Sequence, residues 1–228
     1  MVASMTIAES LAAVRARVAR AAEACGRSPA DVKLVAVSKT KPAQAIREAY
    51  AAGQRAFGEN YAQELDSKER ELQDLRDIEW HFIGHLQSNK ARIVARAAQV
   101  VHTVDGVALA RELGRRAEAL EKSLEVLIEV NIGGEAQKHG CAPSEIAEVM
   151  AAVREQSSLD LRGLMTMPPM DDADAAKRVF ETLASLRTLH GGGAALPEMS
   201  IGMSSDLEIA VACGATIVRV GTAIFGAR

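Results

Sequence analysis

Two parts of the chain carry side chains suited to covalent chemistry and anion binding, and Lys39 belongs to the first. It lies just after the apolar run LVAV, and because side chains alternate along a strand, Val37 and Lys39 share one face. A lysine at the end of a buried strand is partly desolvated, which lowers its pKa and leaves a nucleophilic amine, although most lysines are simply exposed. We predict the amine role for Lys39. Lys41 adjoins Pro42, where a helix is expected to begin, so its side chain is expected to face solvent.

The second part lies near the C-terminus, where hydroxyl groups and a glycine follow two apolar runs. Ser204 and Ser205 lead into a helical segment, so their hydroxyls and the nearby backbone N–H groups suit an anion. Gly221 admits a ligand close to the backbone, and Thr222 adds a hydroxyl. Serines at a helix start are commonly plain caps, but two donor sets on neighbouring strands favour a phosphate site.

Arg219 lies inside the apolar run TIVRVG, on the same face as Gly221. A buried guanidinium needs a partner. That partner is either an acid of the barrel such as Glu129, in a structural ion pair, or a bound ligand. If the partner is a ligand, we expect Arg219→Ala to weaken binding of that ligand, or to change its reactivity, more than it destabilises the fold.

An amine, an anion cradle and an arginine below the cradle together fit one ligand that carries an aldehyde, a phosphate and a ring nitrogen. Pyridoxal 5′-phosphate (PLP) has all three groups, and an arginine partner for its ring nitrogen is a known arrangement. Because arginine stays protonated, it cannot give that nitrogen a full proton, and the ring becomes a weaker electron sink. This combination favours a Schiff base that does not react further, or racemase-like proton transfer, over transamination.

The elements that must position these residues follow from a regular alternation along the chain. Short runs rich in β-branched residues alternate with longer amphipathic runs, as in parallel strands covered on both faces. The expected strands are 32–37, 55–59, 79–84, 99–105, 124–131, 161–166, 198–203 and 216–221. This order predicts the α/β class and a closed (β/α)8 TIM barrel, a single domain over residues 1–228 with its active site at the C-terminal ends of the strands.

An extra N-terminal helix is expected to cover the barrel beside the last strand, which only a short segment follows. The alternative fold is an open doubly wound sheet. We disfavour it because no G-x-G-x-x-G motif follows the first expected strand and no Walker lysine motif occurs.

Composition excludes several classes of protein. The 228 residues are 48% hydrophobic, 25% charged and 3% aromatic, with a net charge of −3. This composition does not favour nucleic-acid or membrane binding, because a basic excess and stacking platforms are missing, and no apolar run is long enough to span a bilayer.

The pattern of possible metal ligands predicts neither a disulfide framework nor a metal site. The chain has 3 cysteines and no C-x-x-C pair, which favours a reduced, cytoplasmic setting. His81 and His85 have a spacing that would suit zinc on a helix. They straddle a strand end instead, so no metal is predicted.

The chain resembles the pyridoxal phosphate homeostasis protein family, which is similar to the barrel domain of bacterial alanine racemases. The resemblance rests on motifs that span nearly the whole chain in order: LVAVSKTKP, FGENYAQE, WHFIGHLQSNK, LMTMPP, MSIGMSSDLEIAV and VRVGTAIFGAR. It implies that Lys39 forms the Schiff base and that Arg219 faces the pyridine nitrogen. It also implies that the phosphate is held by Ser204, Ser205, Gly221 and Thr222. The residues that it implies along the rest of the cofactor are Asn60, His85 and Met203.

The resemblance implies a cytoplasmic, monomeric carrier that buffers PLP in vitamin B6 and amino-acid homeostasis and hands it to PLP-dependent apo-enzymes without catalysis. Alanine racemases add a tyrosine from a further domain, whereas Tyr50 and Tyr61 lie in expected helices and match no such position. Without a second acid or base, two-face proton exchange is slow. A PLP-dependent amino-acid racemase or other low-activity PLP enzyme is one alternative, and a phosphosugar enzyme in which Lys39 attacks a sugar carbonyl is another.

Overall fold

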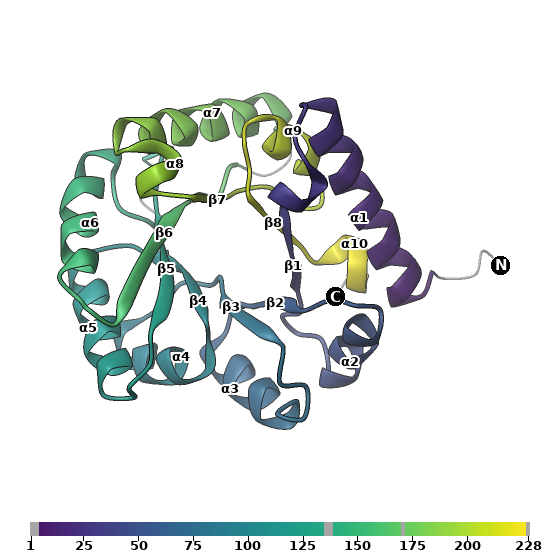
Figure 1. The fold of residues 1–228 in the computed structure, drawn as a ribbon, viewed down its shortest axis with the longest axis horizontal. Helices are drawn as coiled ribbons and strands as arrows, with labels where there is room; N and C mark the ends of the chain where they lie inside the picture. The colour runs from purple at the N-terminus through teal and green to yellow at the C-terminus, as the bar shows by residue number, and fades with distance from the viewer. Residues whose placement is uncertain (1–4, 135–138, 170–171, 227–228) are drawn as a thin grey trace.

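A closed barrel of parallel strands organises the computed structural model, which describes residues 5–134, 139–169 and 172–226 (Figure 1). Neighbouring strands pair in parallel in sequence order, and β8 pairs with β1 to close the ring. The predicted TIM barrel is therefore confirmed. The strands are β1 Lys33–Val37, β2 Ala56–Glu59, β3 Glu79–Phe82, β4 Val100–Val104, β5 Leu124–Glu129, β6 Leu159–Met165, β7 Glu198–Ser200 and β8 Ile217–Val220.

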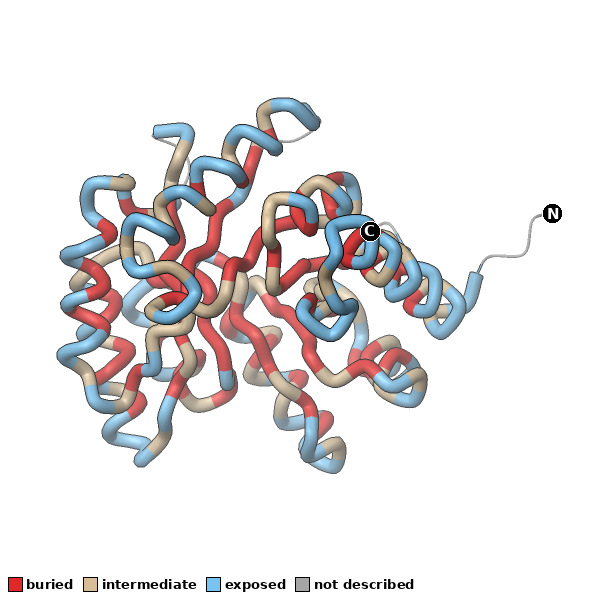
Figure 2. The backbone as a smooth tube through the Cα atoms, turned by 45° about the horizontal axis from the view of Figure 1, so that its top comes forward, coloured by how far each residue is buried: buried red, intermediate tan, exposed pale blue. Residues whose placement is uncertain are grey.

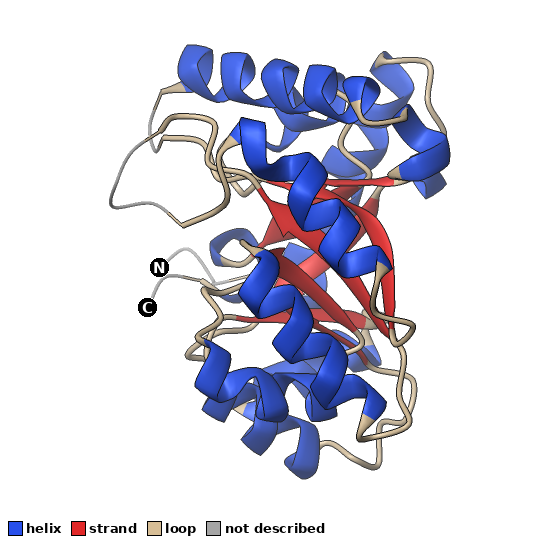
Figure 3. Ribbon diagram, turned by 90° about the vertical axis from the view of Figure 1, so that its left-hand side faces the viewer, coloured by secondary structure: helices blue, strands red, loops and turns tan. Residues whose placement is uncertain are grey.

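Helices surround the strands, as the side view shows (Figure 3). The α-helices are α1 Ile7–Ala24, α2 Ala43–Ala51, α3 Ala62–Glu71, α4 Ala91–Ala97, α5 Val107–Glu118, α6 Ile146–Arg154, α7 Ala173–Leu189, α8 Gly192–Ala195, α9 Leu207–Ala212 and α10 Thr222–Phe225. Short 3₁₀ turns are η1 Pro29–Asp31, η2 Ser88–Lys90 and η3 Pro143–Glu145. No helix in these described ranges is long and apolar enough to cross a membrane.

The N-terminal helix α1 covers the barrel beside its last strand, as expected. It packs against α9 and the single-turn helix α10 (Figure 1). A capping box fixes its start, because Thr6 and Glu9 each satisfy a backbone N–H of the other. The helix therefore lies next to the segments that carry the predicted anion cradle.

The seventh strand is shorter than its apolar run predicts, because the chain turns sharply at Gly202. This glycine has φ +93°, and a Cβ there would lie 2.5 Å from the Cβ of Ala210. Its carbonyl oxygen accepts a hydrogen bond from the Arg219 backbone N–H at 2.9 Å. The turn directs the residues after β7 across the C-terminal end of the barrel.

Most of the core lies between the strands and the helices, where the tube in Figure 2 is buried. A smaller apolar cluster fills the barrel interior and contains Val35, Val100, Leu127, Met165 and Ile217, together with Ala56. Val35 thus faces inward, and alternation places Val37, the last residue of β1, on the same inner face. The barrel axis is packed below these residues and open above them.

Two histidines, His81 on β3 and His102 on β4, are also fully buried in the barrel. Burial lowers the pKa of both imidazoles, so the folded state holds them neutral. A histidine whose folded pKa is depressed costs stability once the pH falls below its unfolded value, because the unfolded chain then binds more protons.

We expect a His102→Gln variant to gain stability relative to the wild type as the pH falls from about 6.5 to about 5. The relative gain is at most about 1.4 kcal/mol per pH unit for one buried histidine. Glu59 and Glu129, with pKa values raised to about 7 by burial, shift stability in the opposite direction, but equally in both proteins. Urea unfolding at several pH values measures the difference, and parallel pH curves would contradict neutral burial of His102.

Candidate functional site

A cavity of about 530 Å³ opens at the C-terminal ends of the strands. Its lining draws on the ends of β1, β2, β7 and β8 and the turns that follow them. The predicted site residues among the lining are Lys39, Asn60, Met203, Ser204, Ser205, Arg219, Gly221 and Thr222. Residues far apart in the sequence therefore meet around one space, whereas Lys41 is outside the lining.

A buried ion pair supports the end of β1 immediately before Lys39. The Lys68 ammonium lies 2.7 Å from Glu59 Oε1 and donates to the Ser38 carbonyl oxygen at 2.8 Å. The Ser38 hydroxyl donates to the same Glu59 oxygen at 2.7 Å. Burial raises the pKa of Glu59 to about 7, while Lys68 acts to lower it. These contacts tie the backbone next to Lys39 to β2 and α3.

The residue on the other side of Lys39 is held as well. Thr40 adopts a left-handed conformation with φ +63°, which is costly for a β-branched residue. Its backbone N–H donates to Glu64 Oε2 at 2.8 Å, and Lys68 binds the same oxygen at 3.0 Å. Lys39 therefore extends from a backbone segment that is fixed at both ends, and it is half-buried at the cavity.

The turn that carries Ser204 and Ser205 leaves both hydroxyls available to a ligand. Neither hydroxyl bonds a described residue, and α9 has no side-chain cap. The Asp206 carboxylate instead accepts from the Met203 backbone N–H at 2.5 Å. Plain capping, the simpler explanation of these serines, is therefore not what the structure shows.

Gly221 lies where β8 passes closest to β1. A Cβ at Gly221 would lie 3.1 Å from the Val37 carbonyl oxygen and 3.3 Å from its Cβ. Thr222, the next residue, is exposed at the cavity and begins α10. The glycine thus keeps the Lys39 strand and the Thr222 turn close together.

Arg219 is 3% exposed, and its partners are uncharged. Nη1 donates to the carbonyl oxygen of Ser200 at 2.7 Å and to its hydroxyl at 2.6 Å. Nη2 donates to the Thr166 carbonyl oxygen at 3.2 Å and lies 3.5 Å from Met167 Sδ. The structural ion pair with Glu129 is absent, although the Glu129 charge acts to raise the pKa of Arg219.

The Arg219 guanidinium still carries its charge at neutral pH, because burial lowers its pKa only to about 10. Among the described residues, none accepts a hydrogen bond from its Nε. Asn60, also at the cavity, has a buried Oδ1 with no described partner. Since buried polar groups are normally paired, the Asn60 oxygen fits a ligand that carries a polar group of its own.

Comparison with known proteins identifies the family of this chain. The family model described as "Alanine racemase, N-terminal domain" matches residues 10–228. The pyridoxal phosphate homeostasis protein of Pseudomonas aeruginosa is 50% identical, over 98% of this chain and 96% of that protein. The Escherichia coli protein of the same name is 47% identical, over 97% of each. The chain belongs to the pyridoxal phosphate homeostasis protein family.

A solved structure of a family relative agrees in fold. PipY of Synechococcus elongatus, solved with PLP bound, is 40% identical and has a TM-score of 0.83. The match covers 97% of this chain and all of that one. The barrel described here is therefore the fold of this relative in the homeostasis family.

The homeostasis-family cavity also has an apolar wall that the sequence analysis missed. It comes from the ends of β3 and β6 and from the start of α7, and its members are Ile83, Met167, Pro169, Ala173 and Ala176. Two of them lie in the motif LMTMPP, which was singled out only as part of the resemblance. Alternation along a strand does not predict which loop residues fold over a barrel mouth.

His85 is the one predicted cofactor residue that does not line the cavity. Its Nδ1 lies 3.6 Å from Asp105 Oδ2, and its ring stacks on His139 with centroids 3.5 Å apart. Ligand atoms of these three residues lie within 4.8 Å of one another. The pair His81 and His85 is not brought together, because His81 is buried in the barrel interior and His85 is exposed.

Arg17 on α1 is a further residue that sequence reasoning missed. Its guanidinium donates to the Ser204 carbonyl oxygen at 3.1 Å and pairs with Glu208 at 2.8 Å. The N-terminal helix therefore holds the serine turn from outside the barrel. The sequence offered only the expectation that this helix lies near the last strand.

We expect Arg17→Ala to weaken phosphate and PLP binding several-fold, because the serine turn loses its external support, while the fold persists. The exposed contact is worth little to stability. Titration with inorganic phosphate and with PLP measures the effect, with Arg20→Ala on the same helix as the control. Unchanged affinity for both ligands would show that the turn needs no support from α1.

Proposed function

We propose that residues 1–228 form one PLP-binding domain, which carries and buffers PLP in vitamin B6 and amino-acid homeostasis. The observation that carries the proposal is the meeting of the Lys39 side chain, the serine turn and Arg219 around one cavity. The names of the relatives and the PLP-bound PipY structure support it.

Each part of the cavity has a distinct role toward the cofactor. PLP supplies an aldehyde that reacts with amines and a ring that stabilises negative charge. The Lys39 amine attacks the aldehyde carbon, and loss of one water molecule leaves a C=N bond to the protein. Ser204, Ser205, Thr222 and the Gly221 backbone hold the phosphate. Arg219 faces the ring nitrogen.

The remaining lining residues position the cofactor without taking part in bond formation. Asn60 offers an amide whose oxygen is unpaired among the described residues. Met203 and the apolar wall cover the ring face and exclude water, which protects the C=N bond from hydrolysis. His85 lies outside the lining, and the contact along the cofactor that the resemblance implies for it stays a prediction.

The positions of the two tyrosines favour a carrier role over racemisation of the alanine racemase type. Racemisation needs a second acid or base on the other face of the ring. Tyr61 is 49% exposed at the start of α3, and Tyr50 bonds Asp77. Neither tyrosine lines the cavity. A tyrosine is therefore not placed to complete two-face proton exchange.

The setting of the protein forms part of the same proposal. We propose a monomer in the cytoplasm that passes PLP to PLP-dependent apo-enzymes. The described cysteines, Cys25, Cys141 and Cys213, are free thiols, as is usual in a reducing compartment. Release to a recipient is compatible with a C=N bond, because addition of one water molecule breaks that bond and returns the free aldehyde and the Lys39 amine. A recipient's lysine can also take the place of the Lys39 nitrogen in the C=N bond and leave Lys39 as a free amine.

Titration of the purified protein tests the function. PLP is expected to bind and to give a visible absorption band, whereas pyridoxal, which lacks the phosphate, binds much more weakly. A preference for a sugar phosphate over PLP would support a phosphosugar enzyme. Sustained conversion of L-alanine to D-alanine, lost in Lys39→Ala, would support a racemase. A protein that takes up no PLP would refute the proposal.

A further inference from the structure

A chain of polar side chains runs through the barrel interior behind Arg219. The Arg219 guanidinium donates to Ser200 Oγ at 2.6 Å. That hydroxyl lies 2.8 Å from His102 Nδ1, and His102 Nε2 lies 2.8 Å from His81 Nδ1. Ser200, His102 and His81 are fully buried. The links come from four strands, β8, β7, β4 and β3, so they cross the interior of the barrel.

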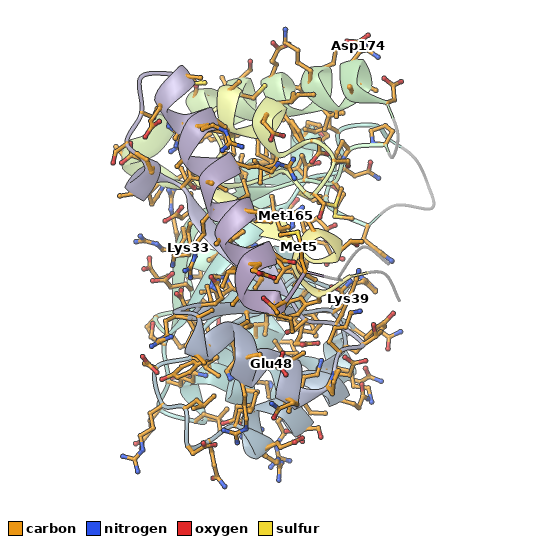
Figure 4. All side chains as sticks on the ribbon, turned by 90° about the vertical axis from the view of Figure 1, so that its right-hand side faces the viewer. Met5, Lys33, Lys39, Glu48, Met165 and Asp174 are labelled. Carbon is orange, nitrogen blue, oxygen red and sulfur yellow. The ribbon has the colours of Figure 1, made fainter. Side chains whose placement is uncertain are left out.

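The chain continues to the opposite end of the barrel. His81 Nε2 lies 3.3 Å from Glu79 Oε1, and Lys33 pairs with the same carboxylate at 2.8 Å. Lys33 and Lys39 lie at opposite ends of the barrel (Figure 4). The pKa of Glu79 is lowered to about 2, first by the nearby His81 and then by Lys33, so this end of the chain is a carboxylate. His81 Nε2 makes no hydrogen bond to a described residue, so Glu79 acts on His81 through its charge.

The arginine end fixes the direction of the hydrogen bonds from Arg219 to His81. Arginine has donors and no acceptor, so Ser200 Oγ accepts from Arg219 and its hydroxyl proton is free for His102 Nδ1. A neutral His102 then carries its proton on Nε2 and donates to His81 Nδ1. His81 accepts at Nδ1, so a neutral His81 carries its proton on Nε2, the nitrogen nearer Glu79.

The opposite direction of these hydrogen bonds is disfavoured by the number of donors at Ser200 and by the charge of Glu79. If His102 Nδ1 carried the proton, Ser200 would receive two donors, and its own hydroxyl proton would need another acceptor. His81 Nε2 would then present a lone pair to the Glu79 carboxylate at 3.3 Å. Double protonation is also disfavoured, since burial lowers the pKa of both histidines and Arg219 lowers that of His102 further.

We infer that His102 and His81 are positioning residues that hold Ser200, and through it Arg219, in the orientation in which the guanidinium meets the cofactor ring. The inference rests on the proposed function. Because every proton in the chain points away from Arg219, the histidines cannot return a proton to it. The ring nitrogen therefore faces a donor whose orientation is fixed through the barrel by Ser200, His102 and His81.

The tautomers test the chain without any cofactor. We expect ¹⁵N NMR of the histidine-labelled, PLP-free protein at neutral pH to show His81 and His102 neutral and protonated at Nε2. Assignment uses the His81→Gln and His102→Gln variants. A proton on Nδ1 of either residue, or an imidazolium, would overturn the inference.

Cofactor binding tests the positioning role. We expect His102→Leu to weaken PLP binding about tenfold, which corresponds to about 1.4 kcal/mol, and to shift the absorption band of the bound cofactor. His102→Gln keeps an acceptor toward Ser200 and a donor toward His81, so it should restore both properties. His190→Leu, at the end of α7, is the control and should match the wild type.

Ser200→Ala breaks the same chain at a small residue and replaces His102→Leu if that variant does not fold. Wild-type affinity and an unshifted band in a folded His102→Leu or Ser200→Ala variant would overturn the positioning role. A wild-type protein that binds no PLP would instead remove the proposed function, and the NMR experiment would still decide the direction of the chain.

Discussion

Lys39→Ala is expected to abolish borohydride-stable attachment of PLP. The amine is the group that forms the C=N bond, and no other residue replaces a nucleophile held at the end of β1. The phosphate contacts and Arg219 remain, so PLP should still bind reversibly, with affinity reduced by a factor of ten or more. Mass spectrometry of the reduced protein, with peptide mapping, measures the attachment.

Lys41→Ala is the matched control, because Lys41 is two residues away and outside the cavity lining. It should retain covalent attachment at the wild-type level. Attachment that survives in Lys39→Ala and disappears in Lys41→Ala would assign the chemistry to Lys41 and contradict the prediction for Lys39.

Lys68→Met is expected to have the largest effect on stability. It removes the partner of the buried Glu59 carboxylate and a hydrogen bond to Ser38. Removing one partner of a buried ion pair costs about 3 kcal/mol, because the remaining carboxyl group either stays charged without its partner or takes up a proton that it would not hold in water. Urea unfolding at neutral pH measures the loss. Since this pair holds the segment before Lys39, PLP attachment should also slow.

The double variant Glu59→Gln/Lys68→Met tests whether the lost stability reflects the uncompensated charge. Removing both charges should recover most of the free energy of unfolding. Attachment should remain slower than in the wild type, because Ser38 is still released from Lys68. Equal stability of the single and double variants would show that packing of the lysine stem, and not charge, determines the effect.

The sequence predicted the barrel because the signal for it is local. Each strand is a short apolar run and each helix an amphipathic one, so the order of elements can be read along the chain. Closure follows from the number of units, and closure brings Lys39 next to Gly221. The register of β1 against β8, which pairs Val35 with Arg219, confirms that neighbourhood.

The parts that could not be predicted depend on side chains that meet across the fold. Arg17 reaches the serine turn from α1, and Lys68 reaches Ser38 from α3. Both positions read as the charged face of an amphipathic helix. The partners of Arg219 were also misjudged in one respect, since a serine and backbone carbonyls, and not Glu129, satisfy the guanidinium.

His85 shows that a motif does not determine the direction of a side chain in a loop. Its place after β3 is at the correct end of the barrel, but the side chain lies against Asp105 and His139 instead of the cavity. A strand fixes the direction of its own side chains by alternation. Beyond the last paired residue that rule no longer applies, and loop packing decides.

A crystal structure of the protein soaked with PLP tests the central claim most directly. The account predicts electron density continuous from Lys39 Nζ to the cofactor, the phosphate at Ser204, Ser205 and Thr222, and the ring nitrogen next to Arg219. Cofactor density joined to another lysine, or a phosphate bound away from the serine turn, would contradict it.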